Sequence, residues 1–222
     1  MTYLEYKKEI EFDENDYDTI NHFCKSIGIE WTASVWDTDS VRFMAKYAND
    51  IPFIKVPSAC ITDLELLDVI NEELPDVPVI FSTGMSTQDQ VDAALARLDN
   101  VAGIMICNSS YPCRYDQLDL NVLKTYKLAF SPLLAIGYSG HEEGYLPSLT
   151  AIAMDADIIE RHFTLDKNME GTDQKASLDV NEFAALVQHG NMIKEMQGGY
   201  SLHIYPEEEA VMAKLRKNRI PN

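Results

Sequence analysis

The sequence is poor in cysteine and in long apolar runs, and each shortage excludes a class of protein. Its 222 residues include four cysteines, none of them in a Cys-x-x-Cys pair, which argues for reduced thiols. The start of the chain, MTYLEYKKEIEF, lacks the basic and apolar regions of a signal peptide. No stretch approaches the roughly 18 consecutive apolar residues that a membrane-spanning helix needs. The sequence therefore predicts a cytoplasmic protein without a membrane partner.

Basic residues are also scarce. There are 18 of them against 36 acidic residues, and the formal net charge is −18. Such a charge repels polyanions, so nucleic acid and anionic membranes are disfavoured as partners. An anionic substrate would need a local cationic pocket, made by a metal ion or by a placed lysine. The composition, 46% hydrophobic with ten glycines and nine prolines spread along the chain, predicts one globular domain over residues 1–222.

Short β-rich runs alternate with segments whose apolar residues recur at helical spacing. Six runs are predicted as strands: 30–36, 53–58, 78–85, 102–110, 134–140 and 158–164. A helix is expected after each of them. Capping boxes at Thr87–Gln90 and Asp179–Glu182 mark two of the predicted helix starts.

Regular βα units with apolar strands predict a parallel sheet covered by helices, either a barrel or a doubly wound sheet. The sequence has no G-x-G-x-x-G motif, and polar residues follow every strand rather than one switch point, which favours a TIM-type (β/α)₈ barrel. However, six of eight strands are visible, and one helix, 13–27, precedes the first of them. Either two strands are absent or the fold closes in another way.

Two histidines and one lysine stand out at the predicted strand ends. His141 and His162 end neighbouring strands, which lie about 4.8 Å apart in a parallel sheet, so both imidazoles can reach one cation that polarises a carbonyl oxygen. The alternative is that each is a hydrogen-bonded core histidine. Lys55 lies inside an apolar strand, where an unpaired ammonium is costly. A bound anion accounts for it, and the alternative is a side chain that reaches solvent from the strand end.

Five motifs carry a resemblance to a known family: IKVPSACIT (54–62), FSTGMSTQDQVDAAL (81–95), CNSSYP (107–112), IGYSGHEEG (136–144) and ERHFTLDKNMEGTDQKASL (160–178). In this order they resemble the sialic acid synthase (N-acetylneuraminate synthase) family, whose members condense phosphoenolpyruvate with N-acetylmannosamine or a related sugar. The resemblance covers about residues 3–197. It implies a (β/α)₈ barrel, a homodimer and a divalent metal, usually Mn²⁺, with Mg²⁺ or Co²⁺ as alternatives.

The resemblance also implies roles for individual residues. The metal would be held by His141 and His162, which with Lys55 form the implied catalytic group. Phosphoenolpyruvate would be bound by Lys55, Ser58, Ser82, Ser109 and Ser139. The N-acyl hexosamine would be bound by Tyr111 and Asp173. The implied reaction is metal-assisted: the methylene carbon of phosphoenolpyruvate attacks the open-chain sugar aldehyde, water adds, and phosphate leaves.

Three departures from the family pattern qualify these roles. No residues match the glutamate, lysine and glutamine that the family carries on its first two strands, so the activity of this chain alone is in doubt. Cys60 and Gly140 stand where many members have acidic residues, which suggests a different sugar. The C-terminal antifreeze-like domain of many members has no counterpart, and a helix near 207–216 is expected instead.

Two other functions remain open. An aldolase could form a Schiff base through Lys55. Alternatively, a truncated barrel without catalytic activity could act as a binding or assembly partner.

Overall fold

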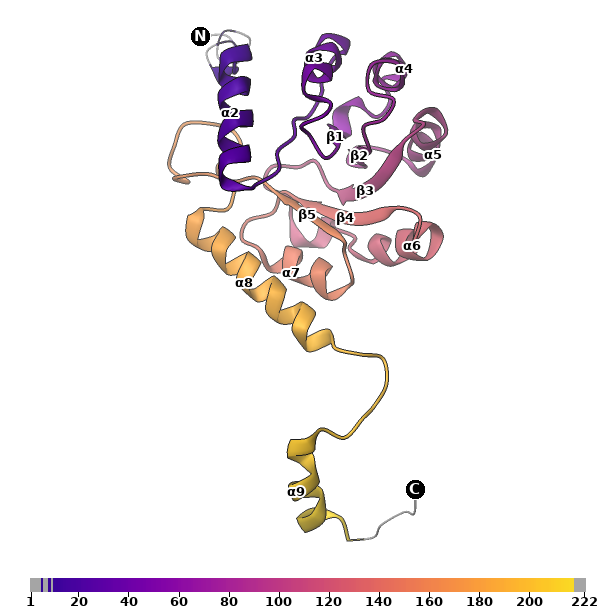
Figure 1. Ribbon diagram of the computed structural model, residues 1–222, viewed down its shortest axis with the longest axis vertical. Helices are drawn as coiled ribbons and strands as arrows, with labels where there is room; N and C mark the ends of the chain where they lie inside the picture. The colour runs from indigo at the N-terminus through magenta and orange to yellow at the C-terminus, as the bar shows by residue number, and fades with distance from the viewer. Residues whose placement is uncertain (1–4, 6–7, 9, 218–222) are drawn as a thin grey trace.

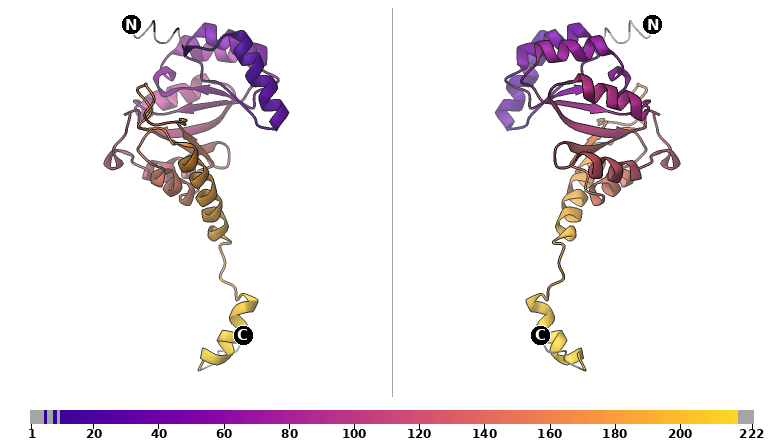
Figure 2. Two further views of the ribbon diagram at one scale, coloured as in Figure 1. Left: turned by 90° about the vertical axis from the view of Figure 1, so that its left-hand side faces the viewer. Right: turned by 90° about the vertical axis from the view of Figure 1, so that its right-hand side faces the viewer.

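In the described part of the chain, five short strands form one parallel sheet, and their order in the sheet is their order in the chain. The computed structural model describes residues 5, 8 and 10–217, so the start of the chain considered above lies largely outside the described residues. The strands are β1 (Ile54–Val56), β2 (Val79–Ser82), β3 (Val101–Cys107), β4 (Ala135–Gly140) and β5 (Ile158–Arg161). The sheet curls as half of a barrel wall (Figures 1 and 2).

Helices follow the strands around the outside of the sheet (Figure 1). They are α2 (Glu14–Ile27), α3 (Thr38–Met44), α4 (Leu64–Glu73), α5 (Gln88–Arg97), α6 (Asn121–Phe130), α7 (Leu146–Ala153), α8 (Val180–Gln197) and α9 (Pro206–Leu215). The described residues also form the short 3₁₀ helices η1 (Ala45–Tyr47), η2 (Ser58–Cys60) and η3 (Tyr115–Gln117). The last helix, α9, stands apart at the end of an extended linker. None of the described helices is both long and apolar enough to cross a membrane.

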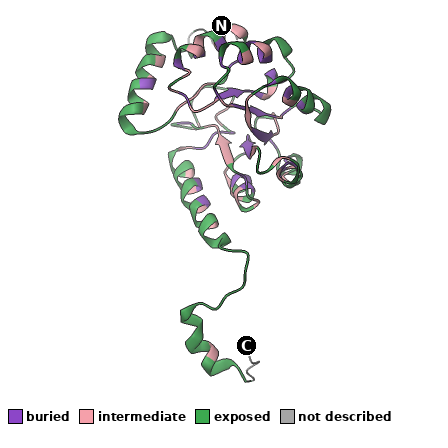
Figure 3. Cartoon of the chain, turned by 45° about the vertical axis from the view of Figure 1, so that its right-hand side comes forward, coloured by how far each residue is buried: buried purple, intermediate pink, exposed green. Residues whose placement is uncertain are grey.

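The hydrophobic core lies between the sheet and the helices α3 to α7. Side chains of β1 and β2 are buried on both faces of the sheet, as expected for a parallel sheet covered on its outer side. Fully buried residues of the core include Ile54, Val56, Phe81, Ile104 and Leu123. In contrast, α8 is mostly exposed (Figure 3), and of its inner face Leu186 and Gly190 are buried.

The local signals at helix ends are confirmed. Asp13 caps α2 through a capping box with Asp16, and Gly28 ends the helix at φ +69°, a conformation that glycine adopts without strain. The predicted capping box of Thr87 with Gln90 begins α5, and that of Asp179 with Glu182 begins α8. These signals are short-range hydrogen bonds, which explains why the sequence alone predicts them.

The prediction of an α/β barrel-type fold is confirmed in part, because the sheet has five strands in the described residues and not six. The predicted strand over 30–36 is reduced to one isolated bridge between Ser34 and Lys55. The amide of Val35 donates to the carbonyl of Lys55 at 3.1 Å. Asp37 then caps α3. A strand is stabilised by a row of hydrogen bonds to a neighbouring strand. Within the described chain, this segment pairs with β1 through a single bridge on one edge.

Glycine at position 137 allows the close pairing of β4 with β5. A Cβ atom built on Gly137 would lie 2.7 Å from the carbonyl oxygen of Ile158, and backbone cannot yield as a flexible side chain can. We therefore expect Gly137→Ala to lower the free energy of unfolding by about 1–3 kcal/mol, the usual cost of overpacking. Urea denaturation measures this. Gly199→Ala, where the new Cβ meets open space, is the control. Equal midpoints for the two variants would contradict the expectation.

Candidate functional site

The polar side chains predicted at the strand ends gather at the carboxyl edge of the sheet. Lys55 of β1 is 7% exposed. Its ammonium donates to the carboxylate of Glu160 on β5 at 3.1 Å. The hydroxyl of Ser139 on β4 donates to the same carboxylate oxygen at 3.3 Å. Because β1 and β5 are the first and last strands of the sheet, this ion pair links the two edges of the half-barrel.

Glu160 changes the argument made for Lys55. The sequence suggests that a buried ammonium needs an anionic ligand, but the ammonium already has a partner within the chain. The carboxylate of Glu160 offsets part of the cost of burying Lys55 and holds its side chain across the sheet. Below the pair, a cavity of about 250 Å³ is lined by both residues and by Ile80, Met105 and Ile158, with Thr32, Ala33, Ser34, Phe53 and Ile159.

His141 and His162 lie side by side at the ends of β4 and β5. Their ring centroids are 5.2 Å apart, in an edge-to-face arrangement. The ring of Tyr111 contacts both histidines, with centroid distances of 4.2 Å to His141 and 5.5 Å to His162. Asp173 lies beyond them, and its Oδ2 is 3.6 Å from Nδ1 of His162. The structure thus brings together the four residues assigned to the metal and the sugar.

Hydrogen bonds set the protonation of His141. Its Nδ1 lies 2.7 Å from the carbonyl oxygen of Asn108, which can only accept, so Nδ1 carries the proton and Nε2 keeps its lone pair. The Tyr111 hydroxyl lies 3.2 Å from that Nε2. Burial, with smaller contributions from neighbouring charges, raises the pKa of Tyr111 to about 12. The phenol is therefore protonated, and its hydroxyl donates a hydrogen bond to Nε2 of His141.

Both imidazoles are held neutral. Burial lowers the pKa of His141, and the hydrogen bond to the Asn108 carbonyl and then nearby Glu160 oppose this only in part. Burial and then the neighbouring His141 lower the pKa of His162, against the opposing effect of Asp173. Neutral imidazole is the form that binds metal ions.

Serine hydroxyls form a second group beside the histidines. The amide of Gly84 donates to Oγ of Ser58 at 3.0 Å. The thiol of Cys107 lies 3.6 Å from that oxygen, 3.7 Å from Oγ of Ser109 and 3.6 Å from Nδ1 of His141. A Cβ on Gly84 would lie 2.1 Å from Oγ of Ser109, so only glycine lets these groups crowd together. Cys107 therefore links the serines to the histidine pair.

The buried hydroxyl of Ser82, at the end of β2, has no hydrogen-bond partner. Such a group is costly unless a ligand or water satisfies it. Ser82 is 2% exposed and is one strand away from Lys55, since β1 pairs with β2. It is therefore a donor available to a bound molecule.

The donor set fits a metal ion with open coordination positions. In the described part of the chain, no group of three or more His, Cys, Asp or Glu side chains is arranged to hold a metal. The two neutral histidines could supply part of a shell, as in catalytic rather than structural sites, once Nε2 of His141 is released from the Tyr111 hydroxyl. The carbonyl that orients His141 is the kind of outer partner that metal-binding histidines use.

Sequence reasoning missed two residues of this site, Glu160 and Cys107. Glu160 lies two residues before His162 and Cys107 two residues after the buried Met105, so strand alternation places each on the face that bears the site. Strand alternation in the sequence could therefore have identified both residues as facing the site. Their partners, 105 residues away for Glu160, could not be read from the local pattern.

Comparison with known proteins gives consistent matches. The NeuB family model matches residues 1–201. The chain is 33% identical over 220 residues to N-acetylneuraminate-9-phosphate synthase of Homo sapiens, covering 98% of this chain and 60% of that protein. It is 32% identical over 195 residues to N,N'-diacetyllegionaminic acid synthase of Legionella pneumophila, covering 84% of this chain and 53% of that protein. The chain thus spans less than two thirds of these relatives' length.

A solved structure supports the fold. The N-acetylneuraminic acid synthetase of Leptospira borgpetersenii, determined in complex with citrate, superposes with a TM-score of 0.81 at 24% identity, covering 94% of this chain and 73% of that one.

The two buried histidines should make stability depend on pH. The unfolded chain, with histidine pKa near 6.5, takes up protons before the folded chain, whose His141 and His162 have lowered pKa values. The contribution of these two histidines to the free energy of unfolding should therefore be complete above about pH 7 and fall below pH 6.5, by at most about 1.4 kcal/mol per pH unit for each histidine.

Urea denaturation at pH 7.5, 6.5 and 5.5 measures this slope. His141→Gln should reduce it, and His203→Gln, at an exposed position in the linker, should leave it unchanged. An unaltered slope in His141→Gln would contradict the interpretation.

Proposed function

Because this chain belongs to the NeuB family, we propose that it carries the catalytic face of a synthase for a sialic or related nonulosonic acid. The family match confirms the resemblance carried by the five motifs. The proposed reaction is that of a transferase: it condenses phosphoenolpyruvate with N-acetylmannosamine or another N-acyl hexosamine and releases phosphate. One observation carries the proposal: the paired histidines, the hydroxyl cluster and the buried lysine share one edge of the sheet.

The anionic reactant would bind at the lysine side of the site. In a chain of net charge −18, the buried ammonium of Lys55 is the local cation that a phosphate and a carboxylate require. Donors for their oxygens would come from the hydroxyl groups of Ser58, Ser82, Ser109 and Ser139. Of these, the hydroxyl of Ser82 is buried without a partner, and a ligand oxygen would satisfy it.

The sugar would bind at the histidine side. His141 and His162 would hold a divalent cation, Mn²⁺ in this proposal with Mg²⁺ or Co²⁺ as alternatives, which when bound supplies a Lewis acid for the aldehyde oxygen. The Tyr111 hydroxyl, which donates to Nε2 of His141, would turn to a sugar oxygen. Asp173, half exposed beside His162, would accept from a sugar hydroxyl. Holding both reactants on adjacent strand ends would supply much of the rate acceleration.

Two alternatives are less well supported. A Schiff base needs the free amine of Lys55, whereas the ion pair with Glu160 uses that side chain as a cation. A barrel without catalytic activity would have no need for a buried, unpaired hydroxyl at Ser82 beside an ordered histidine pair.

Phosphate release tests the function. We expect the chain, with Mn²⁺, phosphoenolpyruvate and a panel of N-acyl mannosamines, to release phosphate, and Lys55→Met to lose at least about 100-fold in rate, as for removal of a key charge-stabilising group. Lys25→Met, which removes an exposed lysine paired with Asp50, is the matched control.

The alternatives give different results in the same samples. Trapping of a carbonyl substrate by borohydride at Lys55 would favour the aldolase. Calorimetric binding of phosphoenolpyruvate without turnover, for any sugar, would favour the binding partner and contradict the synthase.

We also propose that the protein is cytoplasmic and forms a homodimer. Counted with their backbone, the residues of β5 are half-buried, whereas those of β2 are buried, and β5 is an edge strand of the sheet that remains open to pairing. Sedimentation velocity at micromolar concentration should show a species of about twice 25.1 kDa. A sharp boundary at the monomer mass across that range would contradict the dimer.

A further inference from the structure

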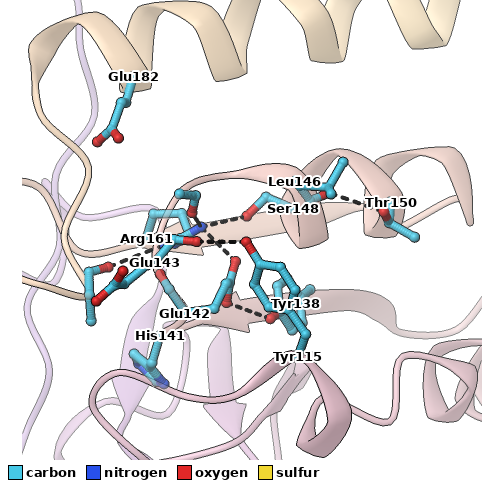
Figure 4. Close-up of polar contacts among 12 residues, drawn as sticks. Tyr115, Tyr138, His141, Glu142, Glu143, Leu146, Ser148, Thr150, Arg161 and Glu182 are labelled. Carbon is cyan, nitrogen blue, oxygen red and sulfur yellow. Dashed lines mark hydrogen bonds and ion pairs between the residues drawn. The ribbon is translucent and has the colours of Figure 1, made fainter.

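A buried ion pair lies directly behind the histidine site. Nη1 of Arg161 is 2.7 Å from Oε1 of Glu142, and both side chains are fully buried. Alternation along β5 sends Arg161 to the face opposite Glu160 and His162. Figure 4 shows Arg161 among Tyr138, Glu142 and Ser148, with the ring of His141 directed away from this cluster. None of the roles assigned above uses this pair.

The guanidinium of Arg161 joins three separate segments. Nη1 donates to Oε1 of Glu142 at 2.7 Å, to the carbonyl of Gly144 at 2.7 Å and to Oγ of Ser148 at 3.0 Å. Nη2 donates to the carbonyl of Glu142 at 2.7 Å and to that of Ala176 at 3.2 Å. One side chain therefore ties the loop after β4, the first turn of α7 and the loop after β5 to strand β5 itself.

Two of the tied segments, the loops after β4 and β5, lead directly to residues of the site. Glu142 follows His141, and the carbonyl of His141 accepts from the amide of Cys113 at 2.9 Å, which fixes the loop that bears Tyr111. On the other side, the amide of Ala176 donates to the carbonyl of Asp173 at 3.0 Å. Arg161 itself precedes His162. The sugar side of the site is thus anchored at one point, whereas none of these five hydrogen bonds of Arg161 goes to Lys55 or Ser58.

The Arg161–Glu142 pair is tightly packed. The second oxygen of Glu142 accepts from the Tyr138 hydroxyl at 2.7 Å. A Cβ atom on Gly140 would lie 2.8 Å from that same oxygen and 3.0 Å from Cδ of Arg161. A lysine at position 161 would supply three N–H donors from one nitrogen in place of a planar fork with two terminal nitrogens, and could not reach all five acceptors.

We propose that Arg161 is a positioning residue, which sets the placement of His141, His162 and Asp173 from behind the sheet through its five hydrogen bonds. Its consequence for catalysis rests on the proposed synthase function, whereas the placement of the histidines does not. A merely structural ion pair would be replaceable by apolar residues of similar volume without effect on the site.

Imidazole nitrogen NMR at pH 8 tests the placement without any substrate. In the wild type, His141 should give the signature of the neutral ring protonated at Nδ1. In Arg161→Lys it should become a mixture of tautomers, and the His162 signals should shift. His22 and His203, on α2 and in the linker, should keep their signals in every variant.

Two further variants cover the case in which Arg161→Lys does not fold. The triple variant Arg161→Met, Glu142→Leu, Tyr138→Phe leaves no buried charge, and should fold yet show the same altered histidine signals. Ser148→Ala removes one acceptor and should shift the same signals less. Arg114→Lys is the matched control, because Arg114 makes a two-pronged pair with Asp116 on an exposed loop. Wild-type histidine signals in a folded Arg161→Lys or triple variant would overturn the proposal.

If the wild-type chain shows synthase turnover, steady-state kinetics provide a second test of the role of Arg161. Arg161→Lys should raise the KM for the sugar at least tenfold and leave the KM for phosphoenolpyruvate within about twofold. Equal rises in both would overturn the selective positioning. Absence of turnover in the wild type would overturn the proposed function instead, and the NMR result would still decide the role of Arg161.

Discussion

The pairing of β4 with β5 is the constraint on which the rest of the site depends. Ser139 lies opposite Glu160, and Gly140 opposite Arg161. The next residue along each strand is a histidine, so His141 lies beside His162. Side chains then sort by parity: Ser139, His141, Glu160 and His162 face the site, and the residues between them face the helices. A shift of one residue in this register would exchange the two sets. Gly137 lies opposite Ile158, where a Cβ atom would be 2.7 Å from the Ile158 carbonyl oxygen, so a shift that placed any other residue there would not be tolerated.

The buried cations at the site and behind it are each paired with a nearby carboxylate. In a chain of net charge −18, the charge of an exposed cation would be offset by nearby carboxylates and screened by solvent. Instead, the two adjacent residues of β5 each complete a pair in a different environment. Glu160 holds Lys55 on the side of the site, and Arg161 holds Glu142 on the helical side. An anion at the site would therefore compete with a carboxylate already present. Its binding depends on exchange of partners at Lys55 rather than on an excess of positive charge.

What the sequence predicts well is what local forces decide. Capping boxes, the glycine stop after α2 and the alternation of strands with helices depend on residues a few positions apart, and all are present. The strand predicted over 30–36 fails because a strand is stabilised by its neighbours, and this one has a single bridge. Lys55 was correctly singled out as buried. Its partner Glu160, however, is decided by the curl of the sheet, which no periodicity encodes. The paired histidines were predictable because sheet order follows chain order.

The same reasoning accounts for Gly140, where the family resemblance leads one to expect an acidic residue. Any side chain at 140 would collide with Glu142, Tyr138 and Arg161, each within 3.0 Å of the added Cβ. The carboxylate is therefore still present beside His141, but it is supplied from position 142 and is turned toward Arg161. A negative charge in that place serves the guanidinium behind the sheet rather than the mouth of the site. The glycine at 140 and the buried pair at 142 and 161 are thus one arrangement, because a side chain at 140 would occupy the space that this pair fills.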